Sequence, residues 1–375
     1  MVKKIANYYH FENIIQVVTT YFYFISFPSF MSSRLKTGLI LLVITFLVGY
    51  ILIQEYSKVM SKSEITTLPE GYHNVLVRVP TTFEFCGEQV PLYDEEVKES
   101  FDKELYINVF RHSSTSLIIK RSEKFFPIIE KILREEGVPD DMKYIAVIES
   151  GLENVRSYAG ADGYWQFMEE TAKEFGLEIS KEVDERFHIE KATRAACKYL
   201  KRSYKKFGNW TLVAASYNRG MGGMNSALRN QNAISYYDVA LNNETARYIY
   251  RALAFKEIMQ NPEKYGFVIP KELRYPVVEY RKIPLDTTVN DISALAVRYK
   301  MSYKTLKYHN PWLLMNKLTF DAKDIKQGKT YTLFVPQNPP MPHSNVLAQE
   351  SLEMEKMLDS ILREEDTVID IKDVK

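Results

Sequence analysis

The sequence predicts a mainly α-helical protein with a small second domain that mixes helices and strands. Apolar residues recur at helical spacing through much of residues 94–260. Glycine or proline follows several of these runs, as expected at helix ends. The two clear strand-like runs come only after residue 274. A chain of 375 residues, 46% of them hydrophobic and 13% aromatic, has room for two domains with buried cores.

Composition argues against several kinds of partner. The net charge is +1, which gives no reason to expect a nucleic-acid partner. The six histidines are scattered without metal-ligand spacing, so we expect no metal and no cofactor. The two cysteines, Cys86 and Cys197, do not form a Cys-x-x-Cys pair. We expect two unpaired thiols, and a disulfide only if the fold brings them together.

Residues 1–58 hold the targeting information. Residues 37–53 are uncharged and mostly apolar, and at about 1.5 Å per residue they just cross a bilayer core. Arg34 and Lys36 precede them, which favours a cytoplasmic N-terminal side. Neither a small-residue cleavage site nor a lipobox cysteine follows. The sequence therefore predicts an uncleaved signal anchor in membrane lipid, with a cleaved signal peptide as the alternative.

The N-terminal segment, residues 1–36, contains two possible start residues, Met1 and Met31. Residues 14–30 are aromatic-rich and could form another span or an interfacial segment. Residues 31–36 read as an ordinary n-region before the anchor, which favours Met31. The intact mass of the natural protein distinguishes the two starts.

After the anchor, residues 54–84 are expected to form a tether, and residues 85–268 a helical domain. Residues 75–91 are expected to be extended and to wrap onto this domain. Periodicity or uninterrupted apolar character then predicts helices, listed here in order: 94–110, 117–136, one that ends near Gly151, 188–207, 210–217 and 244–260. Gly208 and Pro262 mark the ends of two of them.

The helix that ends near Gly151 carries one acid in an otherwise apolar run. Pro139 and the two aspartates after it suit its first turn, and residues 144–148 leave almost no polar face. Glu149 should therefore lie in the last turn of a buried helix. Apolar surroundings and the negative end of the helix dipole both raise the pKa of such a carboxyl. A proton held near neutral pH suits a general acid, although a buried Glu paired with an Arg is the ordinary structural alternative.

Four motifs in order around this acid resemble a known enzyme family. Residues 149–151 read Glu-Ser-Gly, and residues 157–168 read Ser-Tyr-Ala-Gly-Ala-Asp-Gly-Tyr-Trp-Gln-Phe-Met. Residues 214–220 read Ala-Ala-Ser-Tyr-Asn-Arg-Gly, and residues 244–248 read Glu-Thr-Ala-Arg-Tyr. Together they resemble the lytic murein transglycosylases of the soluble-lytic-transglycosylase type (glycosidase family 23), and more closely the membrane-bound lytic murein transglycosylase D group. The resemblance covers about residues 85–268 and implies a lysozyme-like helical catalytic domain.

The resemblance implies a role for eight residues. Glu149 matches the single catalytic acid and base of the family. Seven others match positions that contact the glycan or shape its groove: Ser157, Gln166, Met168, Tyr217, Asn218, Glu244 and Tyr248. Each also has an ordinary structural interpretation, such as a turn cap, a core amide, a core methionine, a buried tyrosine or a helix cap. Two positions depart from the family: Tyr158 stands where Pro is frequent, and Trp165 could stack on a sugar or fill the core.

The implied reaction cuts the bond between N-acetylmuramic acid and N-acetylglucosamine in peptidoglycan without water and leaves a 1,6-anhydromuramoyl end. One carboxyl suffices because the attacking hydroxyl belongs to the same sugar. A hydrolytic muramidase would need a second carboxylate, for which Glu153, Asp162 and Glu169 are candidates by sequence proximity alone. A non-catalytic peptidoglycan-binding protein is the rival from another class. For an enzyme with this anchor, the resemblance implies a location in the bacterial cell envelope, with the catalytic domain in the periplasm.

The remaining chain forms a second unit and a tail. In residues 274–336, strands are expected at 277–280 and 331–335 and helices at 289–299 and 302–310. This order resembles a lysin-motif (LysM) domain, a small α+β fold that binds N-acetylglucosamine, although residues 285–287 only partly match its usual Gly-Asp-Thr opening. A module that packs on the catalytic domain without binding glycan is the alternative. Residues 337–375 read as a Pro-rich linker and an acidic, solvated tail.

Overall fold

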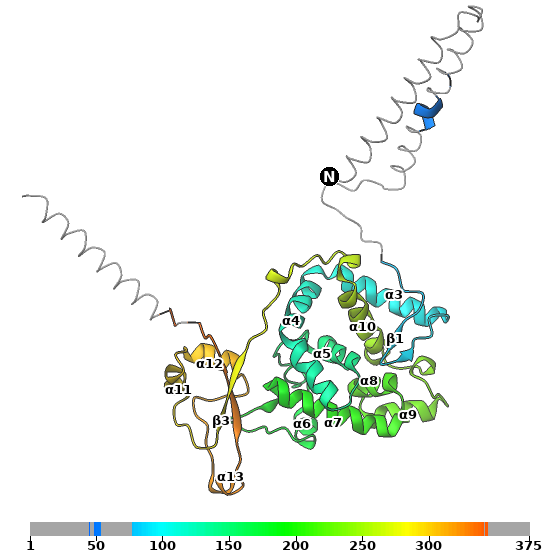
Figure 1. Cartoon of the computed structure of the whole chain (residues 1–375). Coiled ribbons are helices and arrows are strands. Elements are labelled where there is room, and N and C mark those ends of the chain that lie inside the picture. Colours follow the sequence, from blue (N-terminus) through cyan, green and yellow to red (C-terminus); the bar gives the residue numbers. More distant parts are fainter. Residues whose placement is uncertain (1–44, 46–48, 54–76, 341, 344–375) are drawn as a thin grey trace, which may run out of the picture. The chain divides into compact units, whose positions relative to one another are not determined.

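The computed structural model describes residues 45, 49–53, 77–340 and 342–343 (Figure 1). The acidic tail, most of the predicted anchor and most of the tether lie outside the described residues. Within them, every helix is too short or too polar to cross a membrane. Contacts divide the chain into residues 1–74 and 75–375. The second unit holds all the motifs and is described below.

The helical lobe begins with a small hairpin and two long helices. Strands β1 (Glu84–Phe85) and β2 (Glu88–Gln89) pair within the segment expected to be extended. Helix α3 spans Glu95–Phe110, and the Asp94 carboxylate caps it by accepting the N–H groups of Glu96 and Val97. Helix α4 spans His112–Glu135, so it starts five residues before the predicted 117. The polar residues at its start carry no apolar stripe from which the first turn could have been predicted.

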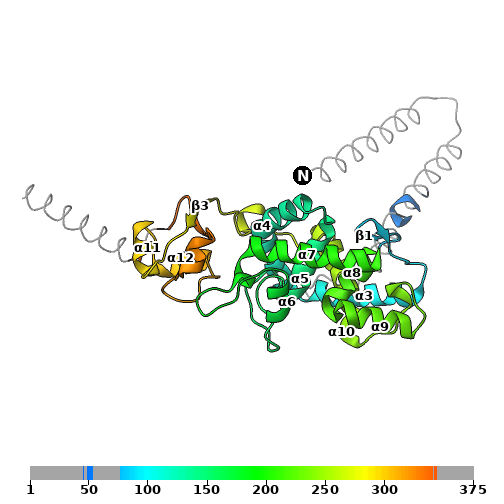
Figure 2. The same ribbon diagram turned by 90° about the horizontal axis from the view of Figure 1, so that it is seen from below.

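The acid-bearing helix lies among longer helices. After a 3-10 turn at Asp140–Met142, α5 spans Lys143–Ser150, and six of its eight residues are buried. Gly151 ends it in the left-handed conformation, with φ +61°, as the sequence predicted. Helices α7 (Ile189–Phe207), α8 (Trp210–Arg219) and α10 (Asn243–Gln260) confirm the predicted runs. Helix α10 packs against α3, α5 and α8 (Figures 1 and 2).

Sequence patterns did not predict two helices of the lobe. Helix α6 (Glu169–Glu174) is only six residues long and buries a single alanine. Helix α9 (Met221–Asn230) contains Gly222 and Gly223, which disfavour helix by about 1 kcal/mol each relative to alanine. Met224 and Ala227 anchor α9 in the core, so tertiary packing outweighs that local cost.

The second part of the unit is a small α+β module. Strand β3 (Tyr280–Leu285) pairs antiparallel with β4 (Tyr331–Pro336), from Tyr280 opposite Pro336 to Leu285 opposite Tyr331. Helices α11 (Ile292–Arg298), α12 (Tyr303–His309) and α13 (Ala322–Lys326) lie between them in sequence. The strand expected at 277–280 was misplaced, because Val277 is exposed and Val278 lines a cavity instead of pairing in a ladder.

One loop of the helical lobe completes the core of this module. Val183 is buried within the module's hydrophobic cluster and pairs with Leu313 in an isolated bridge. On either side, the N–H of Asp184 donates to Trp312 O at 2.9 Å, and the N–H of Leu314 donates to Glu182 O at 2.8 Å. The module therefore contacts the lobe through a short backbone bridge and the side chain of Val183. Cys86 and Cys197 are both free thiols, as expected.

Candidate active site

Glu149 lies in the last turn of α5 and remains partly accessible, although the five residues before it are buried. The hydroxyl of Tyr248 on α10 donates to Glu149 Oε1 at 2.5 Å. Arg251, almost one turn further along α10, donates to the backbone oxygen of Ile148 at 2.7 Å. No ion pair engages Glu149 within the described part of the chain. The acid is therefore neither neutralised by an arginine nor sealed in the core.

Burial raises the pKa of Glu149 to about 7 from its ordinary value near 4.5. The hydrogen bond from Tyr248 and the charge of Arg251 lower it, while the charge of Glu244 raises it. The raised pKa is the one that the apolar run around Glu149 predicted. A large fraction of the carboxyl thus carries a proton at neutral pH, as a general acid requires.

The motif residues on α8 and α10 meet near this acid. Tyr217 donates its hydroxyl to the backbone oxygen of Trp165 at 2.9 Å, and burial raises its pKa well above the ordinary value. Asn218 donates to Glu244 Oε1 at 2.8 Å and accepts the hydroxyl of Thr245 at 2.7 Å. Tyr217 and Asn218 thereby connect α8 to the 157–168 loop and to α10. Glu244 itself is exposed at the start of α10.

The 157–168 loop presents its three predicted contact residues differently. Ser157 Oγ accepts the N–H of Ala161 at 2.9 Å and so caps a turn. Gln166 has φ +49°, and its side-chain nitrogen donates to two backbone oxygens, those of Val155 and Gly163. Met168 is 48% exposed, so it is not a core methionine. Glycan contacts by these residues stay predictions.

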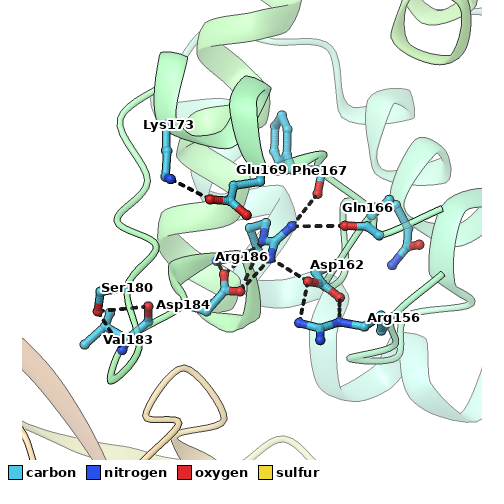
Figure 3. Close-up of polar contacts among 12 residues, drawn as sticks. Arg156, Asp162, Gln166, Phe167, Glu169, Lys173, Ser180, Val183, Asp184 and Arg186 are labelled. Atoms are coloured by element: carbon cyan, nitrogen blue, oxygen red, sulfur yellow. Dashed lines mark hydrogen bonds and ion pairs between the residues drawn. The ribbon is translucent and has the colours of Figure 1, made fainter. Parts of the chain in front are cut away.

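A cluster of ion pairs formed by Arg156, Asp162, Asp184 and Arg186 holds this loop in place (Figure 3). Asp162 accepts two hydrogen bonds from Arg156 and pairs with Arg186 at 2.5 Å. Arg186 also pairs with Asp184 at 2.7 Å and donates to the backbone oxygens of Gly160 and Phe167. Because the backbone of Asp184 bonds to Trp312, the cluster links the loop to the second module.

The three candidate second carboxylates are all paired with cations. Asp162 is buried between the guanidinium groups of Arg156 and Arg186. Glu153 pairs with Arg121, and Glu169 pairs with Lys173 at 2.5 Å. Oxygens held in this way are poorly placed to hold and activate a water, because the cations already occupy them.

Other sequence expectations are corrected or extended. Trp165 is fully buried and donates to Thr193 Oγ1 at 2.9 Å, so it fills the core and offers no face to a sugar. Tyr158, by contrast, is fully exposed. Sequence reasoning missed Arg251 and Arg186. The spacing of Arg251, three residues after Tyr248, could have indicated a shared helix face. No local pattern marks Arg186, whose partners come from separate loops.

Two cavities meet at the ion pair of Arg121 and Glu153, which lines both. The first has a volume of about 440 Å³ and is lined by Ile148 and Ser150, the neighbours of Glu149, and by Arg251. The second has a volume of about 480 Å³, and its lining comes from both parts of the unit and includes four aromatic side chains: Phe125, Tyr164, Tyr275 and Tyr308. Both volumes lie in the range of small-molecule sites.

Two protein-family models match parts of the unit. Residues 126–239 match the transglycosylase SLT domain, and residues 281–339 match the soluble lytic transglycosylase C-terminal LysM-like domain. The predicted fold class is thereby confirmed: a mainly helical, lysozyme-like domain followed by a small LysM-like region.

Among curated proteins, the chain is similar to two that carry the name membrane-bound lytic murein transglycosylase D, from Escherichia coli strains K12 and O6:H1. Each is 26% identical over 195 residues, which is 50% of this chain and 42% of the relative. The chain thus matches less than half of their length. Among solved structures, an inactive mutant of the lytic transglycosylase Slt from Pseudomonas aeruginosa gives a TM-score of 0.31 at 21% identity, covering 40% of this chain and 26% of that one.

Proposed function

We propose that this chain, in which an SLT domain is followed by a LysM-like domain, is a lytic transglycosylase that acts on peptidoglycan. The observation that carries the proposal is the state of Glu149. It lies in the family's Glu-Ser-Gly motif, its pKa is raised to about 7, and a tyrosine hydroxyl orients its carboxylate. Homology to the lytic murein transglycosylase D group supports the substrate class.

In the proposed reaction, protonated Glu149 donates its proton to the oxygen between N-acetylmuramic acid and N-acetylglucosamine. The bond breaks as an oxocarbenium-like state develops at the muramoyl C1. The Glu149 carboxylate then accepts the proton of the C6 hydroxyl of the same sugar as its oxygen bonds to C1. The product is a 1,6-anhydromuramoyl end, and the acid returns to its starting state without consuming water.

The pairing of the three carboxylates nearest in sequence favours this route over hydrolysis. A hydrolytic enzyme that uses two carboxyl groups needs a second carboxylate free to activate water. Glu153, Asp162 and Glu169 are each held by a lysine or arginine. An intramolecular hydroxyl needs no such carboxylate, because it is already delivered beside C1.

The products of sacculus digestion test the proposal. We expect mass spectrometry of purified sacculi treated with the full chain to show muropeptides with anhydro ends, which lack one water relative to reducing ends. Reducing ends would identify a hydrolytic muramidase instead. No released fragments at all, from a folded protein that still binds sacculi, would support the non-catalytic alternative.

We extend the proposal to the other predicted residues. The exposed Met168 would line the glycan groove. So would the other predicted contact residues, Ser157, Gln166, Tyr217, Asn218 and Glu244. Tyr248 would orient the acid through its hydrogen bond. The LysM-like domain would add affinity for N-acetylglucosamine in the strand.

We also propose a place in the cell envelope. The matched relatives are named as membrane-bound, and residues 37–53 have the length and apolar character of a span. An anchor there would keep the catalytic domain on the periplasmic side, within reach of its substrate.

Tyr248→Phe is expected to move the pH dependence of cleavage upward. The Tyr248 hydroxyl stabilises the charged carboxylate and so lowers the pKa of Glu149. Without it the acid stays protonated to higher pH, and the alkaline limb of kcat/KM against pH should shift to more basic values. Rates measured between pH 5 and 9 on isolated strands check this. A limb that stays in place or moves toward acid contradicts the assigned role of Tyr248.

A further inference from the structure

His188 lies at the junction where the LysM-like domain contacts the helical lobe. It is 4% exposed and caps the start of α7, where its Nδ1 accepts the N–H of Lys191. The proton of the neutral ring is therefore on Nε2, which is buried and has no hydrogen-bond partner among the described residues. Two rings of the LysM-like domain pack against this imidazole, with centroids 4.9 Å away in Phe334 and 6.0 Å away in Trp312.

A second histidine lies on the other side of the same junction. His309 ends α12, and its Nδ1 is 3.0 Å from the hydroxyl oxygen of Tyr280. Tyr280 stacks on Phe334 with ring centroids 5.1 Å apart, so a row of aromatic rings connects His309 to His188. Both histidines line one cavity of about 40 Å³, which has room for water but not for a sugar or a peptide.

The charged groups around the two rings oppose their protonation. Three lysines face them, from α4, α7 and β3 respectively: Lys124, Lys191 and Lys282. The other titratable groups that line the cavity are phenols: Tyr164, Tyr280 and Tyr308. The nearest carboxylates are already paired, Glu185 with Lys191 and Glu190 with Lys282. Within the described chain, neither histidine forms an ion pair, so no acid stabilises an imidazolium here.

Burial, followed by the charges of these lysines, lowers the pKa of His188 to about 3 and that of His309 to about 4. The positive end of the α7 dipole acts in the same direction on His188. A free histidine has a pKa of about 6.5. Docking of the two parts therefore favours the neutral rings. The resulting contribution to docking is fully present above about pH 6.5 and is lost as the pH falls from there toward 4.

We propose that this junction is a pH-sensitive switch, in which protonation of His188 and His309 releases the LysM-like domain from the helical lobe. On release, Val183 leaves the core of the LysM-like domain and the backbone bridge around it opens. The larger cavity, whose lining comes from both parts of the unit and includes Arg121 and Glu153, then loses one wall. The same two residues line the cavity at the end of α5, so acid changes the surface next to the candidate active site. The switch does not depend on the reaction proposed above.

Hydrogen exchange in the full chain, held in detergent micelles and corrected for the intrinsic effect of pH, tests the switch. The N–H groups of Asp184 and Leu314 report on docking, because they donate across the junction. Between pH 7.5 and pH 5.0 their opening equilibrium should rise about 30-fold for each histidine, and about 1,000-fold for the two together. The reason is that a released ring is mostly protonated at pH 5.0, whereas a docked ring is not. N–H groups inside α10 should keep their protection.

Variants at the two histidines show whether these rings cause the response. His188→Asn removes one titrating ring and keeps a side chain that can cap α7. With His309→Gln added, the rise between pH 7.5 and pH 5.0 should nearly vanish, even where the changes weaken docking at every pH. His112→Gln is the matched control, since His112 is exposed at the start of α4 and does not line the cavity.

Three results would overturn the switch. The first is a wild-type junction whose protection does not change between pH 7.5 and pH 5.0. The second is a response that survives in the double variant or is lost equally in His112→Gln. The third is an equal loss of protection in α10, which would mean that acid unfolds the lobe instead of releasing the LysM-like domain.

Discussion

Glu149→Gln is expected to abolish strand cleavage, with kcat/KM falling about 1,000-fold or more. Glutamine keeps the size of the side chain but can neither donate a proton to the glycosidic oxygen nor accept one from the C6 hydroxyl. Binding of glycan strands should survive, because the groove and the LysM-like domain are unchanged. Release of soluble muropeptides measures the first effect, and co-sedimentation with sacculi measures the second.

Measuring the stability of Glu149→Gln distinguishes a loss of catalysis from a loss of folding. The pKa of Glu149 is raised in the folded state, so folding favours its protonated form. Its contribution to stability is fully present below about pH 4.5 and is lost as the pH rises through about 7. Glutamine cannot ionise. The variant should therefore match the wild type near pH 4 and gain up to about 3 kcal/mol in free energy of unfolding at pH 8. Retained cleavage by a protein with this stability profile would remove Glu149 from the mechanism.

Gly163→Ala is expected to cost about 2–4 kcal/mol in free energy of unfolding and to remove most activity. A Cβ at Gly163 would lie 2.0 Å from the backbone oxygen of Arg186, and the residue has φ +80°. The obstacle is backbone, and Asp184 and Trp312 hold the segment around it in place. The loop must therefore shift, which displaces the residues that follow it up to Met168. Urea unfolding measures the stability, and muropeptide release measures the activity.

Gly160→Ala is the matched control for this prediction. Gly160 lies in the same loop with φ +89°, but a Cβ there would meet nothing within 4 Å. Only the backbone strain of about 1–2 kcal/mol applies at this position. The difference between the two variants isolates the close approach of Gly163 to Arg186. Equal losses would mean that the contact with Arg186 does not constrain the loop.

Much of the lobe could be predicted because its signals are local. Asp94 caps α3, Gly151 and Gly208 end α5 and α7, and the apolar stripes define the helices between them. Prediction failed where packing decided against local preference. Helix α9 forms despite two adjacent glycines, and Val278 faces a cavity although its neighbours suggested a strand.

In the candidate site, too, some features could be predicted from the sequence and others could not. The position of Glu149 in the last turn of a largely buried helix, and hence its raised pKa, followed from the sequence around it. Its partners did not. From the sequence, Trp165 could either contact a sugar or fill the core. In the structure it packs in the core and donates a hydrogen bond to Thr193 on α7. Arg186 had no visible role until the fold placed Asp162 and the backbone oxygens of Gly160 and Phe167 against it (Figure 3).

The sequence by itself determined most of the helices, the two-part organisation and an acid whose pKa is raised by burial, because helix periodicity, capping and burial act over a few neighbouring residues. Only the tertiary structure decided which groups surround that acid. The hydrogen bond from Tyr248 spans 99 residues of sequence, and the pairing of Val183 with Leu313 spans more. Contacts at such separations depend on how whole helices pack, and no short sequence pattern encodes that packing.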